Sequence, residues 1–145
     1  MSLRETKAFY GSDASPAEQR EAFRSGEIPV AVYGLGKMGL PLAAVYAETC
    51  GNVVGADVDP AVVESVNRGD CHVDREPGLD DLVAETVDAG ALRATESPRT
   101  AAKEATVHVV IVPTPITDEN EPDLSILQAV VEDVADGLAA GDLVV

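Results

Sequence analysis

The feature that most restricts the fold of this chain is an apolar, strand-like run that leads through closely spaced glycines into an apolar helix. Residues 30–44 read VAVYGLGKMGLPLAA, with glycine at positions 34, 36 and 39. An uninterrupted apolar strand is typical of a parallel sheet, in which helices cover both faces. Glycines at the junction permit a tight turn and close packing of helix on strand. The segment therefore predicts a strand-loop-helix unit of the α/β class.

The alternation of strand and helix continues along the chain. Further strands are predicted at 53–56, 91–95, 107–112 and from 143 onward, and helices at 38–50, 60–67, 79–88, 98–104 and 124–138. Strands that alternate with helices form a parallel sheet through right-handed crossovers. We therefore expect an α/β fold, a three-layer, Rossmann-like, doubly wound parallel sheet with strand order 3-2-1-4-5.

The last helix has the clearest amphipathic pattern. Its apolar face is predicted to contain Leu124, Leu127, Val131, Val134 and Leu138, with Glu132, Asp133 and Asp136 turned outward. Asp123 is placed to cap this helix and Gly141 to end it. The sequence then ends on Leu143-Val144-Val145, which we interpret as a truncated fifth strand and hence as a fragment of a longer protein.

The first residues differ from the rest, and we expect two parts: an appendage at 1–28 and the α/β domain at 29–145. Ser15-Pro16-Ala17-Glu18 is a capping box with proline at the first helical position. It predicts a short helix that Gly26 closes.

The charge of the chain excludes several partners. With 26 acidic and 10 basic residues the formal charge is −16, so nucleic acid and anionic membranes would be repelled. Acidity spread along the chain, with few lysines, indicates a protein that works in concentrated salt, where repulsion is screened. There is neither a membrane-length apolar stretch nor a signal peptide, and we expect a cytoplasmic protein. Cys50 and Cys71 lack metal-ligand spacing, so no metal site is predicted.

The glycine loop has the pattern of a dinucleotide-binding site. Gly34 permits the tight turn, Gly36 lets a pyrophosphate approach the backbone, and Gly39 lets the helix pack closely. Asp57 ends the next strand and would accept hydrogen bonds from the adenosine ribose. A carboxylate there repels a 2′-phosphate, which favours NAD over NADP. The structural alternative is a turn between two buried elements.

A second candidate site is the exit of the strand at 107–112. It reads Val112-Pro113-Thr114-Pro115, and in an open parallel sheet this edge faces the ligand crevice. Two prolines would hold the threonine hydroxyl in one place. From the residues alone, a cofactor contact and an ordinary strand exit remain equally open.

Together these segments resemble the UDP-glucose/GDP-mannose dehydrogenase family of nucleotide-sugar dehydrogenases. The matching motifs are GLGKMGLPLA, GADVDP, VNRGDCHVDREPGL, VVIVPTP, and PDLSILQAVV with GDLVV, which extend from Pro29 to Val145. The Asn67-x-Gly69 motif, the EPGL loop at 76–79 and the PTP exit are the specific elements. Within the family the chain looks most like the UDP-N-acetyl-D-mannosamine dehydrogenases.

The resemblance implies oxidation of C6 of a nucleotide sugar from alcohol to carboxylate with two NAD+ per turnover. It implies a cofactor-binding set of Gly34, Leu35, Gly36, Lys37, Met38, Gly39, Asp57, Pro113 and Thr114. Many members have a basic residue five positions after the ribose acid, where this chain has Val62. A UDP-sugar partner and a homo-oligomer are implied for the full-length enzyme.

The family's catalytic residues have no counterpart here, because they lie beyond the segment that the resemblance covers. Cys50 and Cys71 lack the glycine-rich setting of the family nucleophile, so the chain alone is expected to bind NAD without catalysing oxidation. His72 is expected to be a solvated loop residue, Glu76 to cap the helix that follows it, and His108 to be a hydrogen-bonded core residue.

Two other functions share parts of this pattern. Hydroxyacid dehydrogenases of the 6-phosphogluconate type also begin with GLGxMGxPxA, but Asp57 argues against their NADP-using members. Regulatory nucleotide-binding modules of potassium transporters have a similar length and a similar glycine loop. Neither group is expected to have the EPGL and PTP elements.

Overall fold

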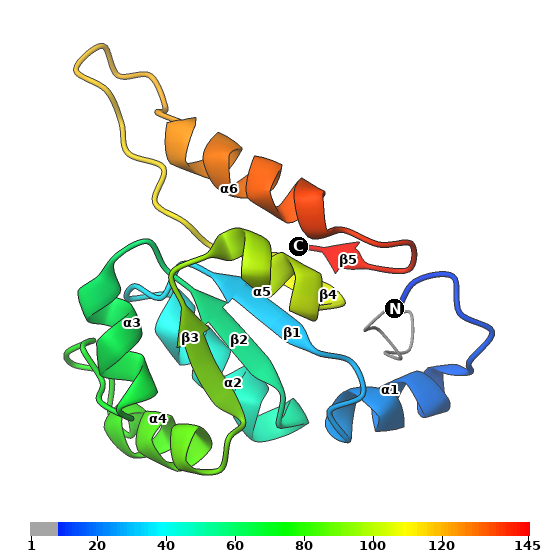
Figure 1. The fold of residues 1–145 in the computed structure, drawn as a ribbon. Helices are drawn as coiled ribbons and strands as arrows, with labels where there is room; N and C mark the ends of the chain where they lie inside the picture. Colours follow the sequence, from blue (N-terminus) through cyan, green and yellow to red (C-terminus); the bar gives the residue numbers. More distant parts are fainter. Residues whose placement is uncertain (1–8) are drawn as a thin grey trace.

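The computed structural model describes residues 9–145, in which helices surround a parallel sheet (Figure 1). The elements follow the order α1 (Pro16–Arg24), β1 (Val30–Tyr33), α2 (Gly39–Cys50), β2 (Val53–Ala56), α3 (Pro60–Asn67), α4 (Leu79–Asp88), β3 (Leu92–Thr95), α5 (Pro98–Glu104), β4 (Val107–Val110), α6 (Ser125–Gly137) and β5 (Leu143–Val144). The predicted elements are confirmed, with small shifts of some ends.

The five strands form one sheet in the order β3-β2-β1-β4-β5, as predicted. All four pairings are parallel, and Val30 at the start of β1 lies opposite both Val53 of β2 and Val107 of β4. The carboxyl ends of the central strands therefore meet at one edge. This edge is where an open α/β sheet binds its ligands.

Alternate residues of β1 belong to two different cores. Val30 and Val32 lie in a core with α2 and α4, whereas Ala31 and Tyr33 lie in a second core with α5 and α6. Successive side chains of a strand point to opposite faces, so an all-apolar strand requires cover on both. Figure 1 shows the helices on the two sides of the sheet, which confirms the three-layer prediction.

The helix α1 begins with the predicted capping box. The Ser15 hydroxyl accepts from the Glu18 amide, and the Glu18 carboxylate accepts from the Ser15 amide at 2.7 Å. Ala22 is buried in the core that contains α2, and the ring of Phe23 meets that of Tyr46 edge-on. Residues 1–8 of the predicted appendage lie outside the described residues.

The predicted apolar face of α6 is partly wrong. The helix buries Val130, Val134 and Gly137, whereas Leu124, Val131 and Leu138 are 41%, 47% and 44% exposed. The face is turned because α5 lies close to Gly137, where an added Cβ would stand 2.5 Å from the Cβ of Ala102. Because glycine has no side chain, the apolar pattern of the sequence does not show that this position is in contact with another helix.

The charged side and the ends of α6 also differ from the prediction. Asp133 and Asp136 both pair with Arg99 of α5 instead of facing only solvent. The helix begins at Ser125, so Asp123 stands before its N-cap, where its carboxylate accepts from the Ser125 amide. The helix ends at Gly137, and Gly141 lies in the turn that leads to β5.

Candidate functional site

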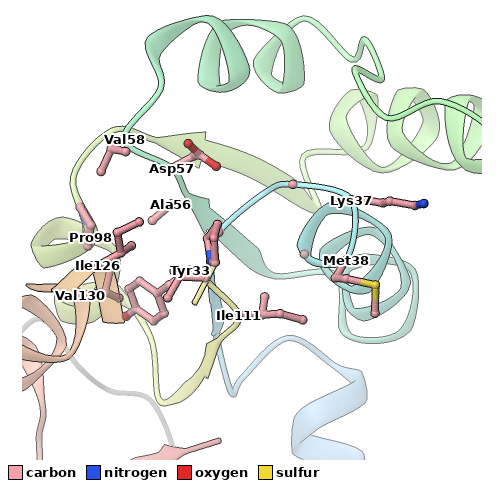
Figure 2. A pocket seen from close by; sticks show the side chains of 15 residues that line it. Tyr33, Lys37, Met38, Ala56, Asp57, Val58, Pro98, Ile111, Ile126 and Val130 are labelled. Carbon is pink, nitrogen blue, oxygen red and sulfur yellow. The ribbon is translucent and has the colours of Figure 1, made fainter. Parts of the chain in front are cut away.

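A pocket of about 400 Å³ opens at the carboxyl edge of the sheet, between the glycine loop and the ends of β2 and β4 (Figure 2). Its lining residues are Tyr33, Gly34, Gly36, Lys37, Met38, Gly39, Ala56, Asp57, Val58, Pro98, Ile111, Val112, Pro113, Ile126 and Val130. Most of the predicted cofactor-binding set is thus brought to one place. Leu35 is buried outside this lining and Thr114, which is exposed, also lies outside it.

The first and third glycines of the loop are required by the protein's own packing. Gly34 has φ +100°, and an added Cβ would stand 2.3 Å from the carbonyl oxygen of Ile111. At Gly39 a Cβ would stand 1.7 Å from the carbonyl oxygen of Gly34. Both contacts involve backbone atoms, which cannot rotate away as a side chain can. They agree with the packing roles predicted for these two glycines.

The second glycine differs, because nothing lies within 4 Å of the position of its missing Cβ. Gly36 lines the pocket, so a side chain here would occupy the pocket and not the protein interior. Among the described residues, the backbone N–H groups of Gly36, Lys37 and Met38 have no hydrogen-bond partner. Free amides at the start of a helix fit an anionic group such as a pyrophosphate. The loop therefore fits a dinucleotide.

Asp57 is fixed at the end of β2 with its carboxylate at the pocket. Its Oδ2 accepts from the Leu35 amide at 3.0 Å, and its Oδ1 accepts from the Asp59 amide at 3.0 Å. These bonds hold the carboxylate, and each oxygen retains a further lone pair for a ligand hydroxyl. In Figure 2 the carboxylate lies between the glycine loop and Val58, whereas the Lys37 and Met38 side chains extend away from it.

Two residues of the 68–78 segment are placed differently from the prediction. His72 is exposed, but its Nε2 lies 2.6 Å from the carbonyl oxygen of Leu35, so it is tied to the glycine loop. Glu76 does not cap α4 with its side chain. Gly78 is the N-cap, with φ +82° and no side-chain bond, and the Leu79 amide donates to the backbone carbonyl of Glu76.

Part of the lining was missed by the sequence reasoning. It consists of Tyr33, Ala56, Val58, Pro98, Ile111, Ile126 and Val130. The strand ends among them could have been found from the rule that ligands bind at the carboxyl edge. Ile126 and Val130 could not, because their place depends on how α6 is turned. His108 is buried as predicted, with Nδ1 2.8 Å from the Tyr33 hydroxyl and Nε2 3.0 Å from Asp142.

Neither cysteine is placed as a nucleophile. Cys50 is buried in the core and Cys71 is half-buried, and neither lines the pocket. Burial raises the pKa of both thiols, which keeps them protonated and unreactive at neutral pH. Over residues 9–145, no group of three or more His, Cys, Asp or Glu could hold a metal ion. No helix in the same range has the length and apolar character needed to cross a bilayer.

A parallel sheet of this order, with a glycine loop and a carboxylate at its carboxyl edge, defines the class of Rossmann-like dinucleotide-binding domains. Residues 28–145 match the profile described as "UDP-glucose/GDP-mannose dehydrogenase family, NAD binding domain". The chain therefore belongs to this family, and its cofactor is NAD.

Individual relatives agree with this assignment. The chain is 37% identical over 116 residues to the UDP-N-acetyl-D-mannosamine dehydrogenase of Salmonella typhi, and 41% identical over the same length to the NDP-N-acetyl-D-galactosaminuronic acid dehydrogenase of Ralstonia nicotianae. Each match covers 80% of this chain and 26% of the relative, so the chain spans about a quarter of these relatives. The structure of the UDP-D-ManNAc dehydrogenase of Pyrococcus horikoshii superimposes with a TM-score of 0.75 at 34% identity, over 81% of this chain and 27% of that one.

Proposed function

We propose that this chain is the cofactor-binding part of an enzyme that oxidises the C6 alcohol of a UDP-sugar to a carboxylate. The observation that carries the proposal is the pocket in which the open side of Gly36, with its free amides, lies beside the Asp57 carboxylate. The favoured substrate is UDP-N-acetyl-D-mannosamine, followed by UDP-glucose. The names of the relatives support an N-acetylated sugar, because both refer to one.

Different residues of the chain are proposed to bind different parts of the cofactor. The amides of Gly36, Lys37 and Met38 would donate to the pyrophosphate, and Asp57 would accept from the adenosine ribose hydroxyls. The exposed Val58 and the adjacent Pro98 offer an apolar wall beyond that carboxylate, suited to the adenine ring. Figure 2 shows both side chains on the same side of Asp57.

The reaction sets what this chain must do. Conversion of CH2OH to COO− with one water removes four electrons, so it consumes two NAD+ and releases two NADH. Bound NAD+ supplies the hydride acceptor in each step. The chain's own part is to hold the cofactor in one orientation and to let the first NADH leave. Because no nucleophilic cysteine lines the pocket, we expect the 145-residue chain to bind cofactor without oxidising the sugar.

Calorimetric titration of the chain in molar salt tests the proposal. Separate titrations with NAD+, NADP+ and UDP-N-acetyl-D-mannosamine should give binding of NAD+ only. Asp57→Arg should abolish NAD+ binding, because it removes the acceptor and introduces a large side chain at the pocket. A chain that melts cooperatively but binds no dinucleotide would contradict the proposal. Tighter binding of NADP+ than of NAD+ would contradict the role of Asp57.

The substrate itself requires the complete enzyme. NADH formation followed at 340 nm, with UDP-N-acetyl-D-mannosamine and UDP-glucose as competing substrates, would identify the sugar. The product uronic acids are building blocks of polysaccharides, and their nucleotide precursors and NAD+ share the cytoplasm. A cytoplasmic enzyme of polysaccharide biosynthesis that forms homo-oligomers is therefore part of the proposal.

Adaptation to concentrated salt is a separate proposal that rests on the formal charge of −16. Screening of repulsion between exposed carboxylates should raise the melting temperature as KCl increases from 0.1 to about 3 M. A melting temperature that is highest at low salt would contradict it.

A further inference from the structure

Leu35, the residue between the first two glycines of the loop, is held at three points. Its amide donates to Asp57, and its carbonyl accepts from His72 at 2.6 Å. Its side chain is fully buried against Gly55 of β2, where an added Cβ would stand 2.6 Å from a Leu35 methyl carbon. Leu35 is thus fixed by the end of β2 on one side and by the 68–78 segment on the other.

The bond from His72 has a definite direction. A carbonyl oxygen only accepts, so Nε2 carries the proton and donates it. The acceptor belongs to the peptide group between Leu35 and Gly36. In a planar trans peptide the C=O and N–H bonds point in opposite directions. Fixing the Leu35 carbonyl toward His72 therefore fixes the Gly36 N–H to point away from it.

That N–H is one of the free donors of the loop, and Gly36 lines the pocket. A glycine rotates about its backbone more freely than any other residue, so the peptide before it needs an external constraint. A hydrogen bond to the carbonyl also polarises the peptide, which strengthens the N–H as a donor. His72 supplies both effects although it lies 37 positions after Leu35 in the chain.

The backbone on both sides of His72 is anchored, so its position is defined. The Asp70 amide donates to the Ser65 carbonyl, and the Ser65 hydroxyl donates to the Asp70 carbonyl. Val73 is buried against the core that contains α2 and α4. The imidazole therefore acts from a fixed support and not from a free loop.

We propose that His72 is a positioning residue of the NAD site. Through the Leu35 carbonyl it holds the Gly36 amide in the orientation that donates to the pyrophosphate. The inference rests on the proposed role of the glycine loop, and it assigns to the 68–78 segment a part in cofactor binding. His72 itself touches no cofactor atom in this scheme.

The test compares His72→Ala, His72→Gln and the control Asp74→Ala in the 145-residue chain. Asp74 is exposed, belongs to the same segment and lies outside the NAD pocket. NAD+ affinity is measured by calorimetry, unfolding by melting temperature, and the Leu35 and Gly36 amides by 15N NMR without cofactor. His72→Ala should weaken NAD+ binding about five- to tenfold and shift or broaden the Gly36 signal. His72→Gln, which keeps a donor, should restore most of both, and the control should match the wild type.

Two results would overturn the proposal. One is an unchanged Gly36 signal in His72→Ala, which would show that the imidazole does not hold the peptide. The other is equal NAD+ affinity of His72→Ala and wild type. A melting temperature within about 3 °C of wild type for all variants separates positioning from general destabilisation. Wild type that binds no NAD+ would contradict the proposed function, and the NMR comparison would still decide the role of His72.

Discussion

The loops that follow β1 and β4 leave neighbouring strands at the same edge of the sheet, but they are held in opposite ways. The first half of the glycine loop is bonded to other elements: the Gly34 amide donates to the Ala56 carbonyl, and Leu35 is bonded through its amide to Asp57 and through its carbonyl to His72. The segment after β4 is exposed throughout residues 113–122. Figure 1 shows it as an arm that projects past the first turn of α6.

The bonds of this arm, defined here as residues 113–122, are mostly internal. Ile116 and Pro122 form an antiparallel bridge, and the Thr117 amide donates to the Glu121 carbonyl at 2.8 Å. Ile116 is 73% exposed, so the bridge buries little apolar surface. A loop that is fixed before binding loses little entropy when a small ligand arrives. The comparison therefore places cofactor affinity in the glycine loop and predicts that the arm contributes little to it.

The largest effect is expected at Gly39. In Gly39→Ala the new methyl would overlap the Gly34 carbonyl oxygen, and neither backbone can move without opening the loop. We expect a loss of about 3 kcal/mol of unfolding free energy and no measurable NAD+ binding. Urea unfolding and calorimetry check this. A variant that keeps full stability would show that the loop is less constrained than its contacts indicate.

Gly36→Ala should separate binding from stability. Nothing in the protein meets the added methyl, so the urea midpoint should stay near that of wild type. The methyl enters the pocket where the pyrophosphate is proposed to approach the backbone, and NAD+ affinity should fall more than about tenfold, or 1.4 kcal/mol. Equal affinity for NAD+ in Gly36→Ala and wild type would show that the pyrophosphate does not bind at this position.

The sequence predicts the strand order, the capping box and the packing glycines because each depends on local pattern or on a general rule of α/β folds. Strands that are apolar at every position must be covered on both faces, and the helices that alternate with them provide this cover. Gly39 is predictable because a helix that starts directly after a strand must pass close to it. The part of the NAD pocket that the glycine loop and Asp57 form follows from these rules.

What the sequence does not predict depends on contacts between distant segments. The face of α6 is decided by the approach of α5 to Gly137, a residue without a side chain to count. The bond from His72 to Leu35 joins positions on different elements, and an exposed loop histidine gives no sign of its partner. Contacts between distant segments leave no mark in the periodicity of the sequence, which explains why neither feature was predicted.

A smaller effect is expected from Asp57→Asn. The amide keeps one oxygen to accept from the Leu35 or Asp59 amide, but the charge that strengthens these bonds and the ribose bonds is lost. Because charged hydrogen bonds exceed neutral ones by about 1 kcal/mol, NAD+ affinity should fall about five- to tenfold. The matched control is Asp59→Asn, which keeps an acceptor for the Ala61 amide and should bind NAD+ as wild type does. Equal losses of NAD+ affinity in both variants would show that the loss of a negative charge, and not the loss of a ribose contact, weakens binding.

The smallest effect is expected from Thr114→Ala, at the base of the arm. The family resemblance places Thr114 near the cofactor, but its side chain is exposed and lies outside the pocket lining. A single neutral hydrogen bond at an exposed position corresponds to about a two- to threefold change in NAD+ affinity. The control, Thr117→Ala, removes a hydroxyl whose bond to the Glu121 amide lies within the arm, and it should leave NAD+ affinity unchanged. If Thr114→Ala instead weakens NAD+ binding as much as Asp57→Asn, the arm must close over the cofactor, and the contrast between the two loops would describe only the chain before binding.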